Sequence, residues 1–326
     1  MTSPFIAVRD LEKSYSVRRG LFGAKRELRA VAGISFDIEE GGTFGLVGES
    51  GSGKTTTAKL ILSAESPTAG SIEIGTRDIS GHTSSETFAL RRALQPVLQD
   101  PYSSLSPRMR AGRIIDEPLR IHGIGDSASR ARKVAELLDL VGLPADAAHR
   151  YPSEMSGGQR QRIAIARALS LEPRCIVLDE PVSALDVSIQ AQILNLLKDL
   201  QRRLKLTYLL ISHDLAVVSY MSSRIGVMYL GRLVEQGDRA AVLKDGRHPY
   251  TLALVTGATP GRRNPVALQG EIPSPLNQPP GCPFHTRCPM ARDICRTEAP
   301  ALKPVGDDHL AACHFSDISR TELSHA

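Results

Sequence analysis

The chain has 326 residues, of which 41% are hydrophobic and 23% are charged, and its formal net charge is +5. This length favours about two domains with a full hydrophobic core, and the mildly basic charge excludes no class of partner. Aromatic residues make up only 4% and Trp is absent, which argues against stacking on single-stranded nucleic acid as the main activity.

The sequence lacks the features of a membrane-spanning or secreted chain. No apolar run approaches the roughly 18–20 residues of a spanning helix. The N-terminal segment has no charged stretch followed by an apolar core, so we expect no signal peptide. We therefore expect a cytosolic chain that acts at a membrane only through a partner.

The first part of the chain predicts short strands followed by a phosphate-binding unit. Residues 5–17 and 28–42 alternate in polarity, which is typical of antiparallel strands joined by turns. Residues 42–62 indicate an apolar strand, a glycine-rich turn and a helix. Residues 70–80 predict a further edge strand.

The glycine-rich turn, Gly48 to Thr56, fits the pattern G-x-x-x-x-G-K-[ST] in the strand-to-helix context that this motif requires. Its glycines allow backbone N–H groups to surround phosphate oxygens, while Lys54 would reach the β- and γ-phosphates and the Thr55 hydroxyl would bind Mg²⁺. We call this turn the phosphate loop. The residues predicted to bind nucleotide here are Gly48, Ser50, Gly51, Ser52, Gly53, Lys54, Thr55 and Thr56.

An acidic pair ends a second buried strand. From about Leu90 to Tyr151 the apolar residues recur at helical spacing, and residues 174–181 then return to a buried strand. This strand ends in Asp179 and Glu180, at the edge where parallel sheets bind ligands. We predict that Asp179 holds Mg²⁺ through water and that Glu180 orients and polarises the attacking water.

Three other positions are weaker signals by themselves. His213 ends the next buried strand, where it could contact the γ-phosphate, although a lone histidine there is more often a core or capping residue. Gln99 by itself predicts no more than a glutamine at the protein surface. Two glycines after Ser156 come directly before an apolar helix, whose N-terminus could hold an anion. The residues alone leave the ligand of that helix open.

Six segments, in this order, resemble the nucleotide-binding domain of ATP-binding cassette (ABC) proteins over roughly residues 5–245. They are Gly48–Thr56, Gln99, Ser156–Gln159, Asp179–Glu180, Ser183–Asp186 and His213. The resemblance implies an α/β fold, a P-loop NTPase (RecA-like) core with an antiparallel β subdomain and a helical insert. It implies ATP and Mg²⁺ as cofactors, with Thr55, Gln99 and Asp179 at the ion. It also implies catalytic roles for Glu180, His213 and Gln99.

The resemblance also gives the two-glycine segment a ligand. In this family the segment caps the γ-phosphate held by a second subunit, so that two ATP molecules lie between a head-to-tail pair. The residues that match it are Ser156, Gly157, Gly158 and Gln159. Met155 stands where the family usually has Leu, which is a small change between apolar residues. Tyr15 matches the family's adenine-stacking aromatic residue, and Asp186 belongs to the implied nucleotide site.

Residues 98–109, 151–169, 248–260 and 281–295 are similar to the ATP-binding subunits of oligopeptide and dipeptide importers, a group that includes nickel importers. Residues 15–31 are similar to an insert often found in the second of the two ATPases of such systems. The similarity implies ATP hydrolysis coupled to peptide import, at the cytoplasmic face of the inner (plasma) membrane. The implied partners are a second ATPase subunit, identical or different, two transmembrane permease subunits and an extracytoplasmic peptide-binding protein, with no nucleic acid. An importer of nickel or another solute, an exporter ATPase, or an ABC protein without a transporter are the alternatives.

The C-terminal segment concentrates cysteine. Its spacing, C-x5-C-x6-C-x17-C, lacks the close pairs typical of zinc sites, and its members are Cys282, Cys288, Cys295 and Cys313. Four thiols in a reducing compartment could ligate one [4Fe–4S] cluster, which members of the peptide-import group with this pattern carry. A zinc site that recruits His285 or His314, and four reduced thiols without metal, are the alternatives. Cys175 lies in an apolar run and is expected to be inert core.

The changes of composition and hydrophobic pattern along the chain predict its domains. We expect an ABC nucleotide-binding domain over residues 1–250, with its helical subdomain at about 90–157. Residues 251–326 would form a proline-rich linker and a four-cysteine extension, which we call the C-terminal extension. The linker prolines are Pro260, Pro265, Pro273, Pro275, Pro279 and Pro280.

Overall fold

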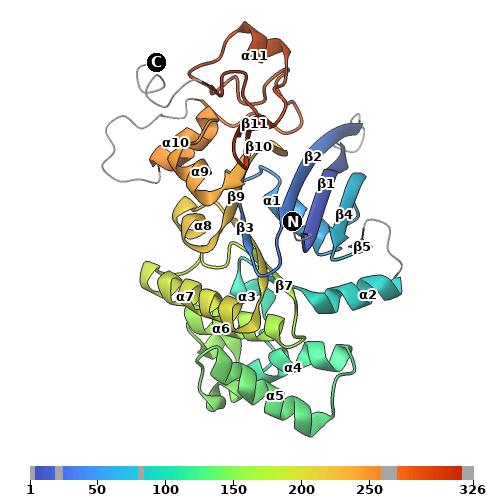
Figure 1. The fold of residues 1–326 in the computed structure, drawn as a ribbon. Helices are drawn as coiled ribbons and strands as arrows, with labels where there is room; N and C mark the ends of the chain where they lie inside the picture. The colour runs from blue at the N-terminus through green and yellow to red at the C-terminus, as the bar shows by residue number, and fades with distance from the viewer. Residues whose placement is uncertain (1–3, 19–24, 80–83, 258–269, 318–326) are drawn as a thin grey trace. The chain divides into compact units, whose positions relative to one another are not determined.

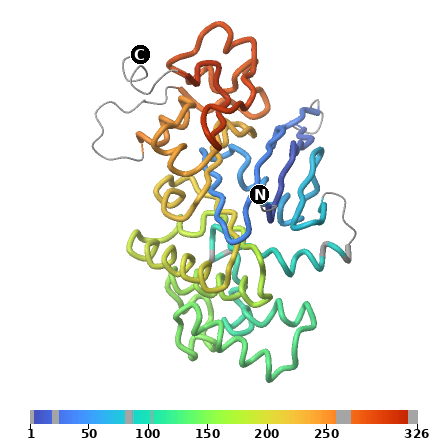
Figure 2. Tube along the Cα trace, viewed as in Figure 1, coloured from blue at the N-terminus to red at the C-terminus, as the bar shows by residue number. Residues whose placement is uncertain are grey.

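The computed structural model describes residues 4–18, 25–79, 84–257 and 270–317 (Figures 1 and 2). The linker prolines Pro260 and Pro265 lie outside these ranges. The chain divides into two compact units, each with its own strands and helices. The first unit comprises Met1–Glu39, Thr43–Gly81 and Ile211–Ala326, and the second comprises Glu40–Gly42 and His82–Leu210.

The first unit contains a four-stranded antiparallel sheet in the order β2-β1-β4-β5 (Figure 1). Its strands are β1 (Ile6–Arg18), β2 (Lys25–Ile38), β4 (Ala69–Ile74) and β5 (Arg77–Asp78). Ile6 of β1 pairs with Ile38 of β2 and with Ile74 of β4, so apolar residues line up across the sheet. The antiparallel strands expected at residues 5–17 and 28–42 are confirmed, although the second ends at Ile38. The single edge strand expected at residues 70–80 is instead the pair β4 and β5, of which β4 lies inside the sheet.

A second set of strands in this unit lies in the order β11-β12-β10-β9-β3. Its members are β3 (Thr43–Val47), β9 (Arg224–Tyr229), β10 (Arg232–Asp238), β11 (Lys303–Gly306) and β12 (His309–Ala311). Strand β3 is fully buried and pairs with β9 in parallel, as an internal strand with an apolar run should. The other neighbouring strands pair antiparallel.

The C-terminal extension joins this sheet by backbone pairing. Gln236 of β10 pairs with Leu310 of β12, and β11 pairs with β12 in turn. Beside this pairing, the fully buried Glu235 carboxylate accepts hydrogen bonds from the backbone N–H of His248 at 2.8 Å and from the His309 ring at 2.7 Å. The extension is therefore attached to β10 through both backbone and side chains.

Among the residues that the structure describes, five helices complete the first unit. They are α1 (Lys54–Ile61), α8 (Leu215–Met221), α9 (Arg239–Lys244), α10 (Pro249–Gly257) and α11 (Asp293–Thr297). Helix α8 packs so closely on β3 that a Cβ atom at Gly45 would lie 2.3 Å from the Ser222 hydroxyl and 2.6 Å from a Val218 methyl. Only glycine fits at this point of the strand.

The second unit is mainly helical around three strands in the order β8-β7-β6. The strands are β6 (Leu94–Val97), β7 (Cys175–Asp179) and β8 (Thr207–Ser212), and β6 and β7 pair in parallel. Cys175 is fully buried, and this burial raises the pKa of its thiol to about 12, so the thiol is inert as expected.

The helices of this unit follow the predicted pattern of a helical insert and a return to α/β structure. They are α2 (Ser84–Ala93), α3 (Pro101–Ser104), α4 (Ala111–Ile121), α5 (Ser127–Leu140), the 3₁₀ helices η1 (Ala145–His149) and η2 (Pro152–Glu154), α6 (Gly157–Leu169) and α7 (Val187–Leu204). Among the described residues, no helix has both the length and the apolar character that crossing a bilayer requires.

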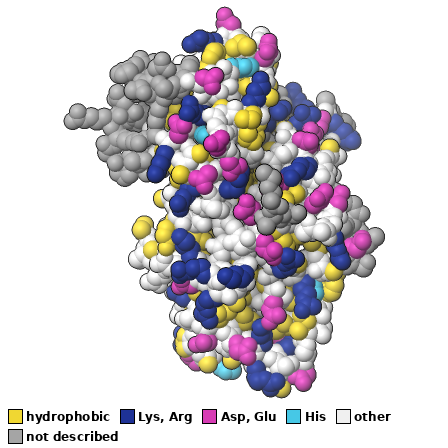
Figure 3. All heavy atoms as spheres, in the orientation of Figure 1, with side chains coloured by type: hydrophobic (Ala, Val, Ile, Leu, Met, Phe, Trp, Pro, Cys, Tyr) yellow, Lys and Arg dark blue, Asp and Glu magenta, His cyan; other side chains and the backbone are white. Residues whose placement is uncertain are grey.

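Figure 3 shows acidic and basic side chains interspersed over the face in view. Several basic side chains also lie together near the middle of that face.

Candidate functional site

The phosphate loop runs from the end of β3 into α1 and lies in tight contact with backbone on both sides. A Cβ atom at Gly48 would lie 2.2 Å from the Met228 carbonyl oxygen, and one at Gly53 would lie 2.3 Å from the Ala30 carbonyl oxygen. Gly53 also has φ 105°, a conformation that residues with a side chain rarely adopt. Gly48 and Gly53 are thus required by the packing of the loop, whereas a Cβ at Gly51 would meet no atom within 4 Å.

Lys54 is buried and its ammonium group lies inside the loop. Its Nζ donates to the carbonyl oxygens of Gly48 at 2.7 Å and Glu49 at 2.9 Å, and to the Ser52 hydroxyl at 3.3 Å. The loop therefore holds a positive charge among oxygen acceptors. A phosphate chain in the loop would offer Lys54 stronger, charged acceptors in place of these neutral ones.

Tyr15 lies beside the phosphate loop. Its hydroxyl donates to the Glu65 carboxylate and hydrogen-bonds the side chain of Thr56. Burial, followed by the bond to Glu65, raises the pKa of Tyr15 above its usual value. The structure thus brings Tyr15 and the loop together, although β1 and the loop are far apart in sequence. Thr55, the predicted Mg²⁺ ligand, is exposed.

In the second unit, the end of β7 carries the acidic pair. Asp179 is buried, with 8% of its surface exposed, and Glu180 directly follows it. Glu180 has φ 48°, the left-handed region that is uncommon without glycine and is enriched at functional sites. The turn is held because the Glu180 carbonyl accepts hydrogen bonds from the backbone N–H and hydroxyl of Ser183.

Gln99 and Glu180 are brought together although 81 residues separate them. The side-chain amide of Gln99 donates to the Glu180 carboxylate at 2.9 Å. This contact fixes the direction of one carboxylate oxygen. The sequence predicted that both residues act on the same nucleotide, and their contact agrees with that prediction without testing either role.

The two-glycine segment begins α6 with a capping box. The Ser156 hydroxyl accepts from the Gln159 backbone N–H at 3.3 Å, and the Gln159 side-chain oxygen accepts from the Ser156 N–H at 3.1 Å. The glycines also have a packing role that the sequence did not predict. A Cβ at Gly158 would lie 2.6 Å from Ile189 of α7, and one at Gly157 would lie 3.0 Å from Leu185.

The two remaining nucleotide-site candidates occupy helix starts. His213 is exposed and lies between β8 and Asp214, whose carboxylate caps α8 by accepting from the Ala216 N–H. Asp186 is exposed at the N-cap of α7, where its carbonyl accepts from the Gln190 N–H. Both are therefore accessible, as residues that contact a ligand must be.

The four clustered cysteines lie close enough to influence one another. Burial raises the pKa of Cys288 to about 12, with smaller contributions from the charges of the other three thiols. Backbone N–H groups approach the sulfurs: Phe315 donates to Cys313 Sγ at 3.4 Å, and Phe284 and His285 donate to Cys282. The Cys282 N–H also donates to the Cys295 carbonyl at 2.8 Å. The extension thus gathers these cysteines in one place.

In the part of the chain that the structure describes, no group of three or more His, Cys, Asp and Glu side chains is placed to hold a metal ion. The two histidines considered for zinc contact carbonyls instead. His285 Nδ1 lies 2.9 Å from the Cys282 oxygen, and His314 Nε2 lies 3.0 Å from the Glu298 oxygen. The zinc alternative gains no support, and the cluster stays a prediction.

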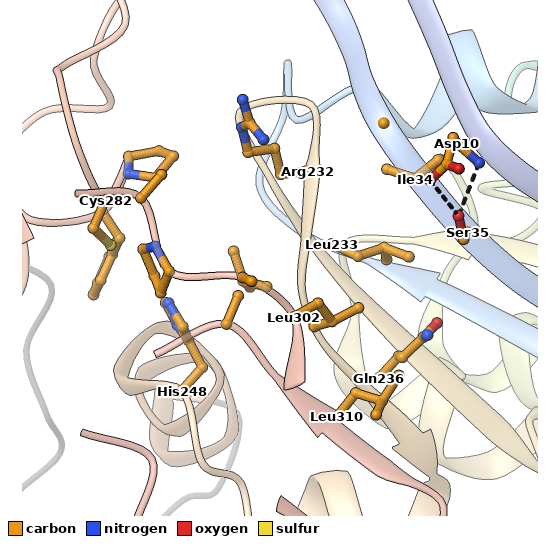
Figure 4. Close-up of a pocket in the computed structure, with 18 residues that line it drawn as sticks. Asp10, Ile34, Ser35, Arg232, Leu233, Gln236, His248, Cys282, Leu302 and Leu310 are labelled. Carbon is orange, nitrogen blue, oxygen red and sulfur yellow. Dashed lines mark hydrogen bonds between the residues drawn. The ribbon is translucent and has the colours of Figure 1, made fainter. Parts of the chain in front are cut away.

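A cavity of about 380 Å³ lies beside Cys282 in the first unit (Figure 4). Leu233 of β10 and Leu302 and Leu310 of the extension give it an apolar lining, with His248 at one side. Burial lowers the pKa of His248 to about 3, so the ring is neutral at physiological pH. The cavity lies among β10, the extension and strands β1 and β2, which contribute Asp10 and Ile34.

Sequence reasoning missed an ion pair at the phosphate loop. Arg287 of the extension donates to the carboxylate of Glu49, at 2.6 Å and 3.1 Å. Glu49 stands at an unspecified position of the motif, and Arg287 lies in residues 281–295, whose similarity to importer subunits gave it no role of its own. Cys282 and Cys288, which flank Arg287, were the residues near it that the sequence singled out.

Two family models match the chain. The ABC transporter family matches residues 31–183, and the C-terminal region of oligopeptide/dipeptide transporters matches residues 234–295. A peptide ABC transporter ATP-binding protein of Sinorhizobium fredii is 49% identical over 96% of this chain and 90% of its own length. An oligopeptide transport ATP-binding protein of Bacillus subtilis is 46% identical over 95% of this chain and 97% of its own length.

Solved structures agree with these matches. A dimeric ATP-binding cassette bound to ADP and phosphate has a TM-score of 0.64 and 28% identity, and it covers 72% of this chain and 98% of its own. A second dimeric structure, of a bacterial ABC transporter cassette, has a TM-score of 0.64 and 29% identity over the same shares. The predicted P-loop NTPase fold is confirmed.

We expect Glu180→Gln to bind ATP and to lose nearly all hydrolysis, because the amide keeps the shape but cannot polarise water. Loss of one such group costs about 10²–10⁴ in rate. Phosphate release at saturating ATP, measured beside nucleotide affinity in the assembled complex, checks this. Glu136→Gln, a change at an exposed glutamate of α5, is the matched control. Hydrolysis by the Glu180 variant at the parent rate would remove Glu180 from the mechanism.

Proposed function

Because this chain belongs to the ATP-binding subunits of the oligopeptide and dipeptide ABC transporters, we propose that it binds and hydrolyses ATP to power peptide import. Peptide is proposed as the cargo because the family model of the oligopeptide/dipeptide transporter C-terminal region matches residues 234–295. These residues include most of β10 and three of the four clustered cysteines. Relatives with peptide-transport names also match nearly their full length.

We propose that the phosphate loop and Tyr15 hold ATP, with Thr55, Gln99 and Asp179 at Mg²⁺. The donor set suits the ion, since a hydroxyl, an amide oxygen and a carboxylate are hard oxygen ligands. Mg²⁺ would neutralise charge on the β- and γ-phosphates. Glu180, oriented by Gln99, would orient the attacking water, and His213 would contact the γ-phosphate.

The proposed partner at the phosphates is a second ATP-binding subunit, identical or different. Ser156, Gly157, Gly158 and Gln159 would cap the γ-phosphate that the partner holds, with Asp186 nearby. The dimeric form of the related cassettes supports this arrangement. So does the start of α6, where N–H groups of the first turn have no partner within the helix.

The other proposed partners are two permease subunits and an extracytoplasmic peptide-binding protein. The chain would then lie at the cytoplasmic face of the membrane as a peripheral subunit. The proposed domains are a nucleotide-binding domain over 1–250, with a helical subdomain at about 90–157, and the C-terminal extension over 251–326. ATP binding would close the pair of subunits and hydrolysis would reopen it.

The peptide cargo is tested with the complete complex, purified with its permeases and binding protein and reconstituted in liposomes. We expect binding protein loaded with a peptide mixture to stimulate ATP hydrolysis and to deliver peptide into the lumen. A complex carrying Glu180→Gln is the control for uptake without turnover. Stimulation by Ni²⁺-loaded binding protein alone would assign a nickel importer. Co-purification with no permease would contradict transport.

We further propose that Cys282, Cys288, Cys295 and Cys313 ligate one [4Fe–4S] cluster. Their mutual proximity and the N–H groups directed at Cys282 and Cys313 support it, because such groups stabilise thiolate ligands. The ligands of a four-iron cluster bind different irons, so they need not surround one point as zinc ligands do. The proposed role is to hold the extension in its folded form.

Anaerobic purification, with iron and sulfide analysis and a visible spectrum, tests the cluster. We expect about four iron and four sulfide per chain, with loss of the colour in Cys288→Ser. Cys175→Ser is the matched control, since that thiol is buried in β7. A colourless protein with stoichiometric zinc would replace the cluster by the rival metal. Absence of any metal, with the extension still protease-resistant, would leave four reduced thiols.

A further inference from the structure

The phosphate loop contains a carboxylate, which is unexpected where a triphosphate binds. Glu49 follows Gly48, and its position is fixed by three bonds of its backbone. Its N–H donates to the Tyr250 hydroxyl at 2.8 Å, and its carbonyl accepts from Lys54 and from the Ser52 N–H. An uncompensated negative charge at this point would repel the phosphates of a bound nucleotide.

Arg287 compensates this charge with two-point geometry. Its two terminal nitrogens donate to the two Glu49 carboxylate oxygens, at 2.6 Å and 3.1 Å. The side chain of Arg287 is only 5% exposed, whereas that of Glu49 is 26% exposed. Paired donors and removal from water make this a far stronger contact than a surface ion pair. The guanidinium also lies 5.9 Å from the centre of the Tyr229 ring.

The C-terminal extension holds Arg287 in place. The Arg287 N–H donates to the Phe284 carbonyl at 3.0 Å, which closes a turn between Cys282 and Cys288. Phe284 is 1% exposed and packs edge-on against Tyr229 with ring centres 5.3 Å apart. It also packs against Tyr250, the residue that binds the Glu49 N–H, at 5.5 Å. One buried aromatic cluster therefore supports both partners of the ion pair.

We propose that Arg287 is a positioning residue for the nucleotide, because it neutralises Glu49 and thereby makes ATP affinity depend on the folded C-terminal extension. The proposal rests on the proposed nucleotide site at the phosphate loop. It is independent of the cargo and of which metal, if any, the cysteines hold.

The proposal gives the cysteine-containing segment a function at the nucleotide. Cys282 and Cys288 flank the turn that presents Arg287. Any change at these thiols that opens the turn would withdraw the guanidinium and leave Glu49 charged beside the phosphates. ATP affinity would then depend on whether the turn between Cys282 and Cys288 in the extension is closed or open.

The test is a calorimetric titration of ATP into the assembled complex, with Glu180→Gln in every protein to prevent hydrolysis. Arg287→Met removes the charge and keeps an unbranched side chain against Tyr229. We expect it to weaken ATP binding by about three- to thirty-fold at low salt, with a smaller loss at high salt. Adding Glu49→Gln to it should restore affinity to within about two-fold of the parent, because no charge is then left unpaired.

Arg287→Lys keeps the positive charge and should retain most of the ATP affinity. It replaces Arg287→Met in the titration if the methionine variant does not fold. Asp308→Asn is the control, because it breaks another ion pair between the extension and the sheet, to Arg224, away from the loop. It should leave ATP affinity unchanged. Lys54→Ala tests the nucleotide site separately from the role of Arg287. If this variant bound ATP with the parental affinity, the phosphate loop would not be the nucleotide site. Unchanged affinity in Arg287→Met, or no rescue by Glu49→Gln, would overturn the role of Arg287.

Discussion

The close approach of backbone at the phosphate loop is the constraint on which the proposed nucleotide site depends. Gly48 and Gly53 each lie where a Cβ would stand little more than 2 Å from a carbonyl oxygen of another strand. Packing therefore holds the loop from outside. Lys54 supplies positive charge within that loop, and Arg287 removes the negative charge of Glu49 at its edge. The site is thus electrostatically arranged before any nucleotide binds.

The second unit contains the groups that we propose to act on a phosphate rather than hold it. Glu180 adopts a left-handed backbone conformation at the end of β7, and its carboxylate is oriented by Gln99. Strain of this kind persists only where surrounding contacts determine it, here the turn closed by Ser183. The start of α6 is set in a similar way by its capping box, whose glycines pack against Leu185 and Ile189. Both sites are fixed by local contacts within one unit.

The sequence predicted most of this because the signals are local. Glycine spacing between an apolar strand and a helix predicted the phosphate loop, and an apolar strand ending in two acids predicted Asp179 and Glu180. The ion pair between Glu49 and Arg287 could not be predicted, since 238 residues separate its members and neither follows a periodic pattern. The pairing of β12 with β10 was missed for another reason. A strand of three residues is too short to carry a recognisable alternation.

The most direct measurement is an experimental structure of the assembled complex carrying Glu180→Gln, with ATP and Mg²⁺ bound. The account predicts that Lys54 Nζ leaves the carbonyl oxygens of Gly48 and Glu49 for the β- and γ-phosphates. It also predicts that the two hydrogen bonds between Arg287 and Glu49 remain. Nucleotide bound outside the phosphate loop would contradict the account, as would an ATP-filled loop in which Lys54 still donates to those two carbonyls.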